Sequence, residues 1–406
     1  MQIKKYPVFV GVSVLVIFLA VVGCASMGTS TTSVHLQRVQ ASPQYRDGRF
    51  VNPLPVQNGL NGEGHMSWNL ARRWLTGSEV RVPEQALPVV QRHRAEFARP
   101  ARDGLRLTWL GHSSVLIEID GYRVLTDPLW ASSASPFSFH GSQRFSAPPL
   151  ALSELPTLDA VVISHDHYDH LDRATITFLN SNTAAKFIVP LGIGARLERW
   201  GVANERIVEL DWWQEYALGG LTLAATPARH FSGRGLFDGD KTLWSSWVIV
   251  GPTRRVFFSG DTGMFSGFAE IGRRYGPFDA TLIDTGGYSA LWADVHLGPE
   301  QAVRAHQDLR GRLLVPIHWA TFSMALHAWT EPVERLLVAA EAERVTVATP
   351  RPGESIEPSA PVSVDRWWPA VPWQRAGEAP VVSSGMGNPE KARRAVPGQW
   401  RAWAPH

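Results

Sequence analysis

The feature that most constrains this chain is a run of metal-binding side chains directly after a short apolar segment. Residues 160–163 (Ala-Val-Val-Ile) predict a buried β-strand, and residues 164–170 (Ser-His-Asp-His-Tyr-Asp-His) follow at once. Three of the 14 histidines lie within these positions. Imidazoles and carboxylates that leave a strand end in a loop point in several directions, which suits two adjacent metal ions better than one. A solvated His-rich turn is the structural alternative.

Three further candidate ligands follow other predicted strands. His230 comes after the predicted strand 221–226, Asp261 after 256–259, and His318 after 313–317. These positions are C-terminal strand ends, where α/β-type sheets assemble their sites. Each residue alone has a common structural explanation, but together they complete a two-metal site. The predicted metal ligands are therefore His165, His167, Asp169, His170, His230, Asp261 and His318.

The pattern of elements predicts sheets covered by helices. Short β-rich runs at 105–110, 114–119 and 122–126 predict a meander. Beyond the His-rich run, strands alternate with helices, and Asp172 is the predicted N-cap of one of them. Two such mixed halves predict a four-layer αββα sandwich of the α/β class.

The N-terminus has the pattern of a signal peptide. Lys4 and Lys5 precede an apolar run over residues 8–22, which is short for a membrane-spanning helix. Residues 21–24 (Val-Val-Gly-Cys) resemble the lipobox of bacterial lipoproteins, in which the cysteine is acylated and becomes the first residue. No aspartate follows Cys24, so we expect a lipid anchor in the outer membrane, facing the periplasm. An uncleaved anchor helix is the alternative.

Composition excludes several classes of site. Cys24 is the only cysteine, so the chain offers no internal disulfide and no thiolate metal ligand. Removal of Lys4 and Lys5 leaves 37 basic residues (39 − 2) against 37 acidic ones. A neutral mature protein carries no whole-molecule signal for nucleic acid, and we expect no such partner.

Composition also divides the chain into five segments. We expect a signal peptide at 1–23, a tether at 24–49, an N-terminal extension at 50–104, the main domain at 105–357, and a C-terminal extension rich in tryptophan and proline at 358–406. The interpretation of the last segment is a low-complexity extension partly packed on the domain, with an interfacial aromatic segment as the alternative. Its tryptophans are Trp367, Trp368, Trp373, Trp400 and Trp403.

Residues 164–172 look like the H-x-H-x-D-H signature of metallo-β-lactamase-fold hydrolases. More closely, the chain resembles the N-acylphosphatidylethanolamine-hydrolysing phospholipase D family. The resemblance covers about residues 105–337, and 50–53 (Phe-Val-Asn-Pro) are a candidate extension of it. The blocks that carry it are 109–113 (Trp-Leu-Gly-His-Ser), 125–128 (Leu-Thr-Asp-Pro), 153–156 (Ser-Glu-Leu-Pro), 209–213 (Glu-Leu-Asp-Trp-Trp), 243–247 (Leu-Trp-Ser-Ser-Trp), 260–263 (Gly-Asp-Thr-Gly) and 318–322 (His-Trp-Ala-Thr-Phe).

The resemblance implies a metallo-β-lactamase sandwich and two sets of ligands joined by one bridging carboxylate. One metal is expected on His165, His167 and His230, the other on Asp169, His170 and His318, with Asp261 as the bridge. A carboxylate can bridge two cations, whereas an imidazole with one protonated nitrogen binds only one. Zinc suits a His/Asp site without thiolates, and iron and manganese stay open. A bridging water is the expected nucleophile.

The resemblance also places His296 near a substrate phosphate, so Asp261 and His296 are the expected catalytic residues; a helix-flanking histidine is the alternative for His296. Tyr288 and Trp292 are further candidates for the same pocket. We expect Asp166 and His112 to support the site without binding metal. The stretch Asp284-Thr285 and the residue Val295 depart from the family pattern, which bears on specificity.

These observations favour a phosphodiesterase that acts on a membrane phospholipid. The alternative is another hydrolase of this fold, acting on a lactone, thioester or β-lactam, and a third class is a non-catalytic envelope lipoprotein. The complete ligand set argues against that third class. A long apolar groove above the metals is expected for a phospholipid, and a closed polar pocket for a small ester.

Overall fold

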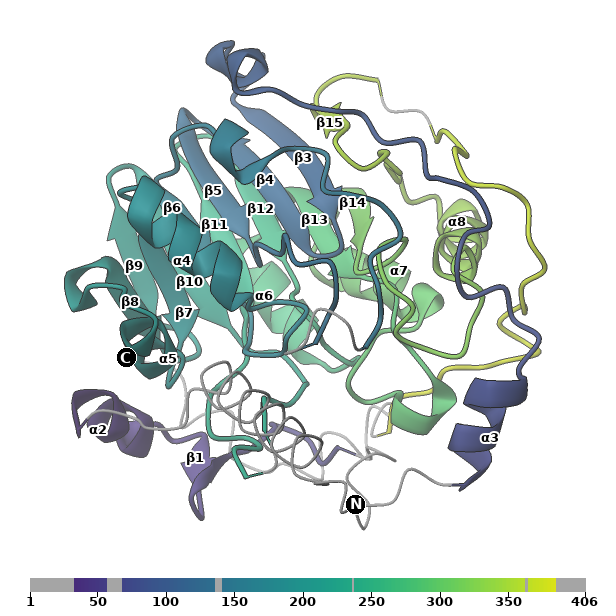
Figure 1. The fold of residues 1–406 in the computed structure, drawn as a ribbon, viewed down its shortest axis with the longest axis horizontal. Helices are drawn as coiled ribbons and strands as arrows, with labels where there is room; N and C mark the ends of the chain where they lie inside the picture. Colours follow the sequence, from purple (N-terminus) through teal and green to yellow (C-terminus); the bar gives the residue numbers. More distant parts are fainter. Residues whose placement is uncertain (1–32, 57–67, 136–140, 236, 362–363, 385–406) are drawn as a thin grey trace, which may run out of the picture.

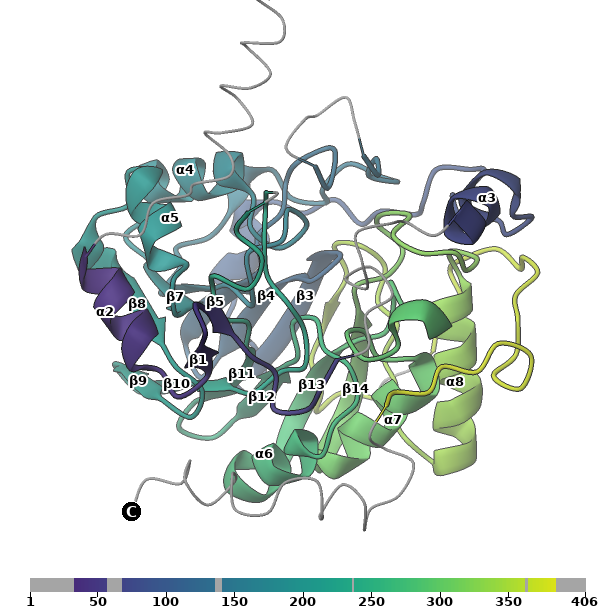
Figure 2. The same cartoon turned by 90° about the horizontal axis from the view of Figure 1, so that it is seen from below.

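The computed structural model places two β-sheets face to face, with helices on the outer side of each (Figures 1 and 2). It describes residues 33–56, 68–135, 141–235, 237–361 and 364–384. Cys24 and the predicted signal peptide lie outside these ranges. Within them, the structure contains no helix that is both long enough and apolar enough to span a bilayer.

The first sheet begins as an antiparallel meander and continues in parallel strands. Two helices cover its outer face, α4 (Arg173–Asn182) and α5 (Gly194–Arg199). In spatial order its strands are β15 (Ser355–Ile356), β3 (Leu105–Gly111), β4 (Ser114–Ile119), β5 (Tyr122–Thr126), β6 (Ala160–Val162), β7 (Lys186–Pro190) and β8 (Ile207–Leu210).

The second sheet has the same plan, because an antiparallel meander comes first in the chain and parallel strands follow it. Its outer side carries α6 (Gly267–Tyr275) and α7 (Pro299–Asp308), and α8 (Glu331–Glu343) packs against α7. In spatial order its strands are β14 (Gly311–Ile317), β13 (Phe278–Asp284), β12 (Arg255–Phe258), β11 (Ser246–Val250), β10 (Leu221–Thr226) and β9 (Glu215–Leu218). The predicted αββα sandwich is confirmed.

Alternating side chains of the strands fill two separate apolar layers. In β6, Val162 packs between the two sheets, whereas Val161 packs under the outer helices. Successive residues of a strand face opposite sides, so a strand buried on both faces must be apolar at every position. This explains why residues 160–163 form an unbroken apolar run immediately before the His-rich loop.

The expected tether differs from the structure over residues 33–49. This stretch contains α2 (Ser33–Ala41), β1 (Tyr45–Arg46) and β2 (Arg49–Phe50), which pack on the domain. Buried Val39 and Phe50 supply the apolar contacts. They were not predicted, because the surrounding sequence is rich in serine, threonine and glutamine. Further along, α3 spans Trp68–Thr76.

The described part of the C-terminal extension packs against the domain. Trp368 is buried, and its indole donates a hydrogen bond to Glu334 at 2.7 Å. Trp367 contacts the ring of Trp319, which in turn stacks on Trp109. Trp400 and Trp403 lie outside the described residues.

Candidate metal centre

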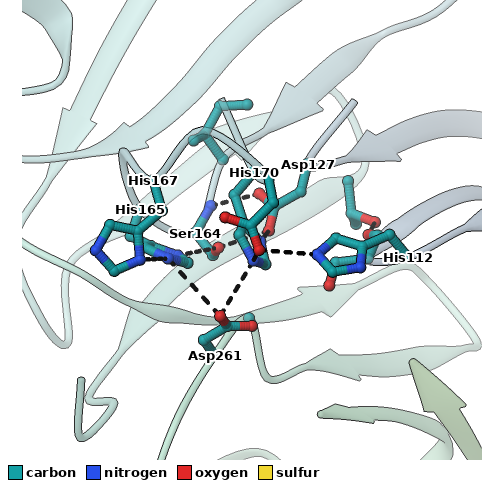
Figure 3. Close-up of polar contacts among 12 residues, drawn as sticks. His112, Asp127, Ser164, His165, His167, His170 and Asp261 are labelled. Atoms are coloured by element: carbon teal, nitrogen blue, oxygen red, sulfur yellow. Dashed lines mark hydrogen bonds and ion pairs between the residues drawn. The ribbon is translucent and has the colours of Figure 1, made fainter. Parts of the chain in front are cut away.

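The candidate ligands converge at one edge of the sandwich, where strands from both sheets end (Figure 3). The loop 164–170 follows β6 in the first sheet. His230 follows β10, Asp261 follows β12, and His318 follows β14 in the second sheet. Each ligand therefore leaves a rigid strand, and the facing sheets bring the two halves together.

Three histidines form the first ligand group. Nε2 of His165 lies 2.8 Å from Nδ1 of His167, and that atom lies 3.3 Å from Nε2 of His230. Burial lowers the pKa of all three imidazoles, with neighbouring histidines adding to the effect at His165. Neutral imidazoles with converging nitrogens are the form that binds a metal ion.

The second group consists of Asp169, His170 and His318. Oδ2 of Asp169 lies 3.3 Å from Nε2 of His170 and 3.4 Å from Nε2 of His318. Both nitrogens are buried and have no hydrogen-bond partner within the described part of the chain. Buried polar atoms rarely lack partners, so their convergence fits a bound cation.

Asp261 stands between the two groups. Its Oδ2 atom lies 3.1 Å from Nε2 of His170 and 3.2 Å from Nε2 of His318, and the same oxygen lies 3.9 Å from Nε2 of His165 and 3.8 Å from Nε2 of His230. Burial opposes ionisation, but the surrounding histidines, His170 first, hold the pKa of Asp261 well below its usual range. An ionised carboxylate here faces both groups, as a bridging ligand would.

Other side chains fix the orientation of the candidate ligands. Asp127 lies 2.7 Å from Nδ1 of His170, and it also accepts hydrogen bonds from the backbone and hydroxyl of Ser164. Nδ1 of His230 donates to the backbone carbonyl of Val295 at 2.8 Å. A partner on one ring nitrogen leaves the other free for metal, so these contacts select the binding tautomer.

The two residues predicted to support the site contact a candidate ligand or the segments around it. Nε2 of His112 lies 3.0 Å from Oδ2 of Asp169, beneath the second group. Asp166 pairs with Arg196 at 2.8 Å and accepts a hydrogen bond from the backbone N–H of Gly233 at 2.8 Å. Both therefore hold ligand-bearing segments in place.

Sequence reasoning missed the contribution of two carboxylates, Asp127 and Asp284. Asp284 ends β13, and its Oδ2 atom lies 2.9 Å from Nδ1 of His296. Nε2 of His296 then lies 3.9 Å from Oδ2 of Asp261. The signal was available, because Asp127 and Asp284 stand at strand ends like the predicted ligands.

A cavity of about 630 Å³ opens over the candidate ligands. Its floor includes Asp261, His296 and His318, and its walls are largely apolar. Wall residues include Trp74, Phe231, Trp292, Val295 and Met324. Trp292 thus lines the pocket as expected.

The expectation for Tyr288 is wrong, because that side chain does not line the cavity. Its buried hydroxyl donates to Glu331 at 2.8 Å, and a buried phenol needs such an acceptor.

Comparison with known proteins agrees with this geometry. Residues 122–319 match the model of the Beta-lactamase superfamily domain. The chain is 38% identical over 326 residues to the N-acyl-phosphatidylethanolamine-hydrolyzing phospholipase D 1 of Caenorhabditis elegans, covering 73% of this chain and 90% of the relative. This chain belongs to the metallo-β-lactamase superfamily. The chain is a metal-dependent hydrolase of this superfamily.

Two other relatives of this metallo-β-lactamase-superfamily hydrolase are bacterial. An uncharacterized protein of Mycobacterium bovis is 47% identical over 350 residues, covering 85% of this chain and 92% of the relative. The outer membrane protein RomA of Klebsiella pneumoniae is 41% identical over 98 residues, which is 24% of this chain and 74% of RomA.

Proposed function

We propose that this hydrolase cleaves N-acylated phosphatidylethanolamine, or a closely related membrane phospholipid, at the phosphodiester bond on the head-group side. The observation that carries the proposal is the apolar cavity directly above the converging His/Asp ligands. Trp74, Phe231 and Met324 offer a lipid the surface that a small polar ester does not need. The similarity to the phospholipase D of Caenorhabditis elegans supports the same substrate class.

The ligand geometry supports two metal ions, and zinc is our choice for both. His165, His167 and His230 would hold one ion, Asp169, His170 and His318 the other, and Asp261 would bridge them. When bound, such ions supply a hydroxide at neutral pH and stabilise the charge that develops on a phosphoryl group.

The side chains of the protein have separate tasks in this reaction. His296, held by Asp284, presents Nε2 to the cavity, where it can contact a phosphoryl oxygen of the substrate. Asp127 and the Val295 carbonyl hold two ligand rings in the required orientation. In the overall step, water oxygen bonds to phosphorus and the bond from phosphorus to the N-acylethanolamine oxygen breaks. The leaving oxygen takes up the proton released by the water.

Location at the cell envelope completes the proposal. Acylation of Cys24 would keep the cavity close to a bilayer that contains the substrate. The similarity to the outer membrane protein RomA supports an envelope protein, and we place it at the outer membrane facing the periplasm.

The test is product analysis with purified, metal-loaded enzyme and vesicles that contain N-acylphosphatidylethanolamine. We expect phosphatidic acid and N-acylethanolamine in equal amounts, and no products from the Asp261→Ala variant. A parallel panel of lactones, thioesters and a β-lactam provides the comparison. Turnover of one of these compounds without any phospholipid cleavage would replace the proposal by the alternative function.

A further inference from the structure

We infer that the N-terminal segment 50–56 holds one ligand of the metal centre in place, and that Asn52 is the positioning residue for this ligand, His230. The inference rests on the metal ligands of the proposed function and not on its substrate. Asn52 lies far from His230 in the sequence, in a segment that precedes the first strand of the sandwich. It nevertheless holds the backbone of that candidate ligand directly.

The contact is a two-point clamp. The side-chain amide of Asn52 donates to the backbone carbonyl of His230 at 2.6 Å, and the side-chain carbonyl accepts from the backbone N–H of His230 at 3.1 Å. His230 is fully buried and stands in irregular chain beyond β10, where a sheet ladder cannot supply these bonds. An asparagine amide carries the same donor and acceptor as a backbone peptide, so it replaces the missing strand neighbour.

The clamp itself is fixed to the domain. The indole of Trp244 donates to the side-chain oxygen of Asn52 at 3.2 Å. The backbone N–H of Phe50 donates to Asp240 at 2.8 Å, and the buried Phe50 ring packs in an apolar cluster that includes Trp212 and Trp244. Asn52 therefore sits on an anchored strand end and can transmit a fixed position to His230.

The residue before His230 is also held by hydrogen bonds, to one segment that precedes the sandwich and to one in the C-terminal extension. Buried Arg229 donates to the backbone carbonyl of Pro55 at 2.6 Å and to the hydroxyl of Ser384 at 3.0 Å. The same guanidinium pairs with Asp294 at 3.0 Å. Asp294 directly precedes Val295, whose carbonyl fixes the other ring nitrogen of His230. The N-terminal segment thus fixes the backbone position of His230, and the 294–295 segment fixes the orientation of its ring.

The consequence is specific to one metal position. A shift of His230 would disturb the group formed with His165 and His167 and leave Asp169, His170 and His318 in place. Loss of an outer partner of a metal ligand weakens metal affinity by about 10–100-fold. Removal of the Asn52 amide should therefore release one metal before the other.

The experiment compares Asn52→Ala and Asn52→Asp with wild type and with Asn180→Ala. Asn180 also donates to a backbone carbonyl, that of Gly201 at 2.9 Å, but on α4 away from the ligands. Asn52→Asp keeps the shape and the acceptor oxygen, and it replaces the donor to the His230 carbonyl by a carboxylate oxygen that cannot donate. Metal content is measured by elemental analysis over a graded chelator series, and melting of the metal-free proteins reports folding.

Wild type and Asn180→Ala should lose their metal at the same chelator concentration as each other. Both Asn52 variants should lose one metal at about 10–100-fold lower chelator concentration. Asn52→Asp should do so with an unchanged melting temperature of the metal-free protein. Wild-type metal retention in Asn52→Asp would overturn the inference, even if Asn52→Ala fails to fold. Because no substrate enters these measurements, failure of the phospholipid proposal would leave their result intact.

Discussion

Nδ1 of His296 lies 2.9 Å from a carboxylate oxygen of Asp284, at the floor of the cavity. The second oxygen of Asp284 lies 3.7 Å from Nδ1 of His318, so one buried carboxylate faces two rings of the site. A carboxylate that accepts the Nδ1–H bond orients the ring, so that Nε2 faces the cavity. The residue that departs from the family pattern therefore orients a candidate catalytic histidine.

Replacement of Asp284 by asparagine should lower kcat by about 10–100-fold, because the ring of His296 loses the charged partner that holds its orientation. Both metals should remain, because no candidate ligand is replaced and the 3.7 Å from Asp284 to Nδ1 of His318 is too long for a hydrogen bond. Combining Asp284→Asn with His296→Ala should cost no more than His296→Ala alone, as expected for residues that act as a unit. Asp279→Asn on the same strand, whose partner is Arg254, is the control and should leave kcat unchanged. Full additivity of the two variants would disprove the pairing.

The proposed bridging role of Asp261 predicts a different metal count for two ligand variants. Asp261→Ala should lower the occupancy of both metal positions, because its carboxylate faces both ligand groups. His165→Ala should mainly empty the position formed with His167 and His230. Elemental analysis of the purified variants decides the point. Two metals retained in Asp261→Ala would contradict the bridge.

The ligand cluster was predictable because its chemistry is local in sequence. Residues 164–170 stand out by their content of histidine and aspartate, and His230, Asp261 and His318 each follow a predicted strand. The sandwich was predictable from the order of strands and helices, which are also recognised from local sequence patterns. Short strands at its edge did not: β9 alternates exposed and half-buried residues over only four positions, which is too brief a pattern to separate from a loop.

The partners of the ligands were harder to find, because they depend on tertiary contacts. Asn52 and His230 are in contact although many strands of both sheets lie between them in the sequence. No spacing rule connects two residues so far apart. Asp284 looked like a departure from a pattern until the structure placed it beside His296. The segment around His35 has few apolar residues, yet a buried ion pair and Val39 hold its helix on the domain.

That ion pair predicts a pH-dependent stability. Nδ1 of buried His35 lies 2.5 Å from Glu209, Nε2 lies 3.3 Å from Glu198, and Arg38 lies 3.9 Å from Glu209. The hydrogen bond to Glu209 raises the pKa of His35 against the opposing effect of burial. Because the folded pKa lies above the unfolded one, this stabilisation is complete below pH of about 6.5 and fades as pH rises through the folded value.

The His35→Gln variant should therefore melt below wild type at pH 5.5, and the difference should shrink toward pH 9. Thermal unfolding followed by circular dichroism over this range measures the effect. His93→Gln is the matched control, since His93 is exposed and only 3.9 Å from its acidic neighbour Glu154. A difference in melting temperature that does not change with pH would rule out the charged pair.

The predicted anchor has its own direct test. Cys24→Ser should prevent acylation and move the protein from the membrane fraction to the soluble fraction, because its single attachment point is lost. Mass spectrometry of the mature N-terminus reports the modification itself. An unmodified, uncleaved N-terminus in the wild-type protein would contradict the lipoprotein interpretation.

The position of the newly formed bond tests the central claim most directly. Metal-loaded enzyme is incubated with N-acylphosphatidylethanolamine vesicles in oxygen-18 water, and both products are analysed by mass spectrometry. Attack of water on phosphorus predicts one heavy oxygen in the phosphate of phosphatidic acid and none in the N-acylethanolamine. Label in the N-acylethanolamine or in a released fatty acid would place the cleavage at a carbon centre and contradict the proposed phosphodiester hydrolysis.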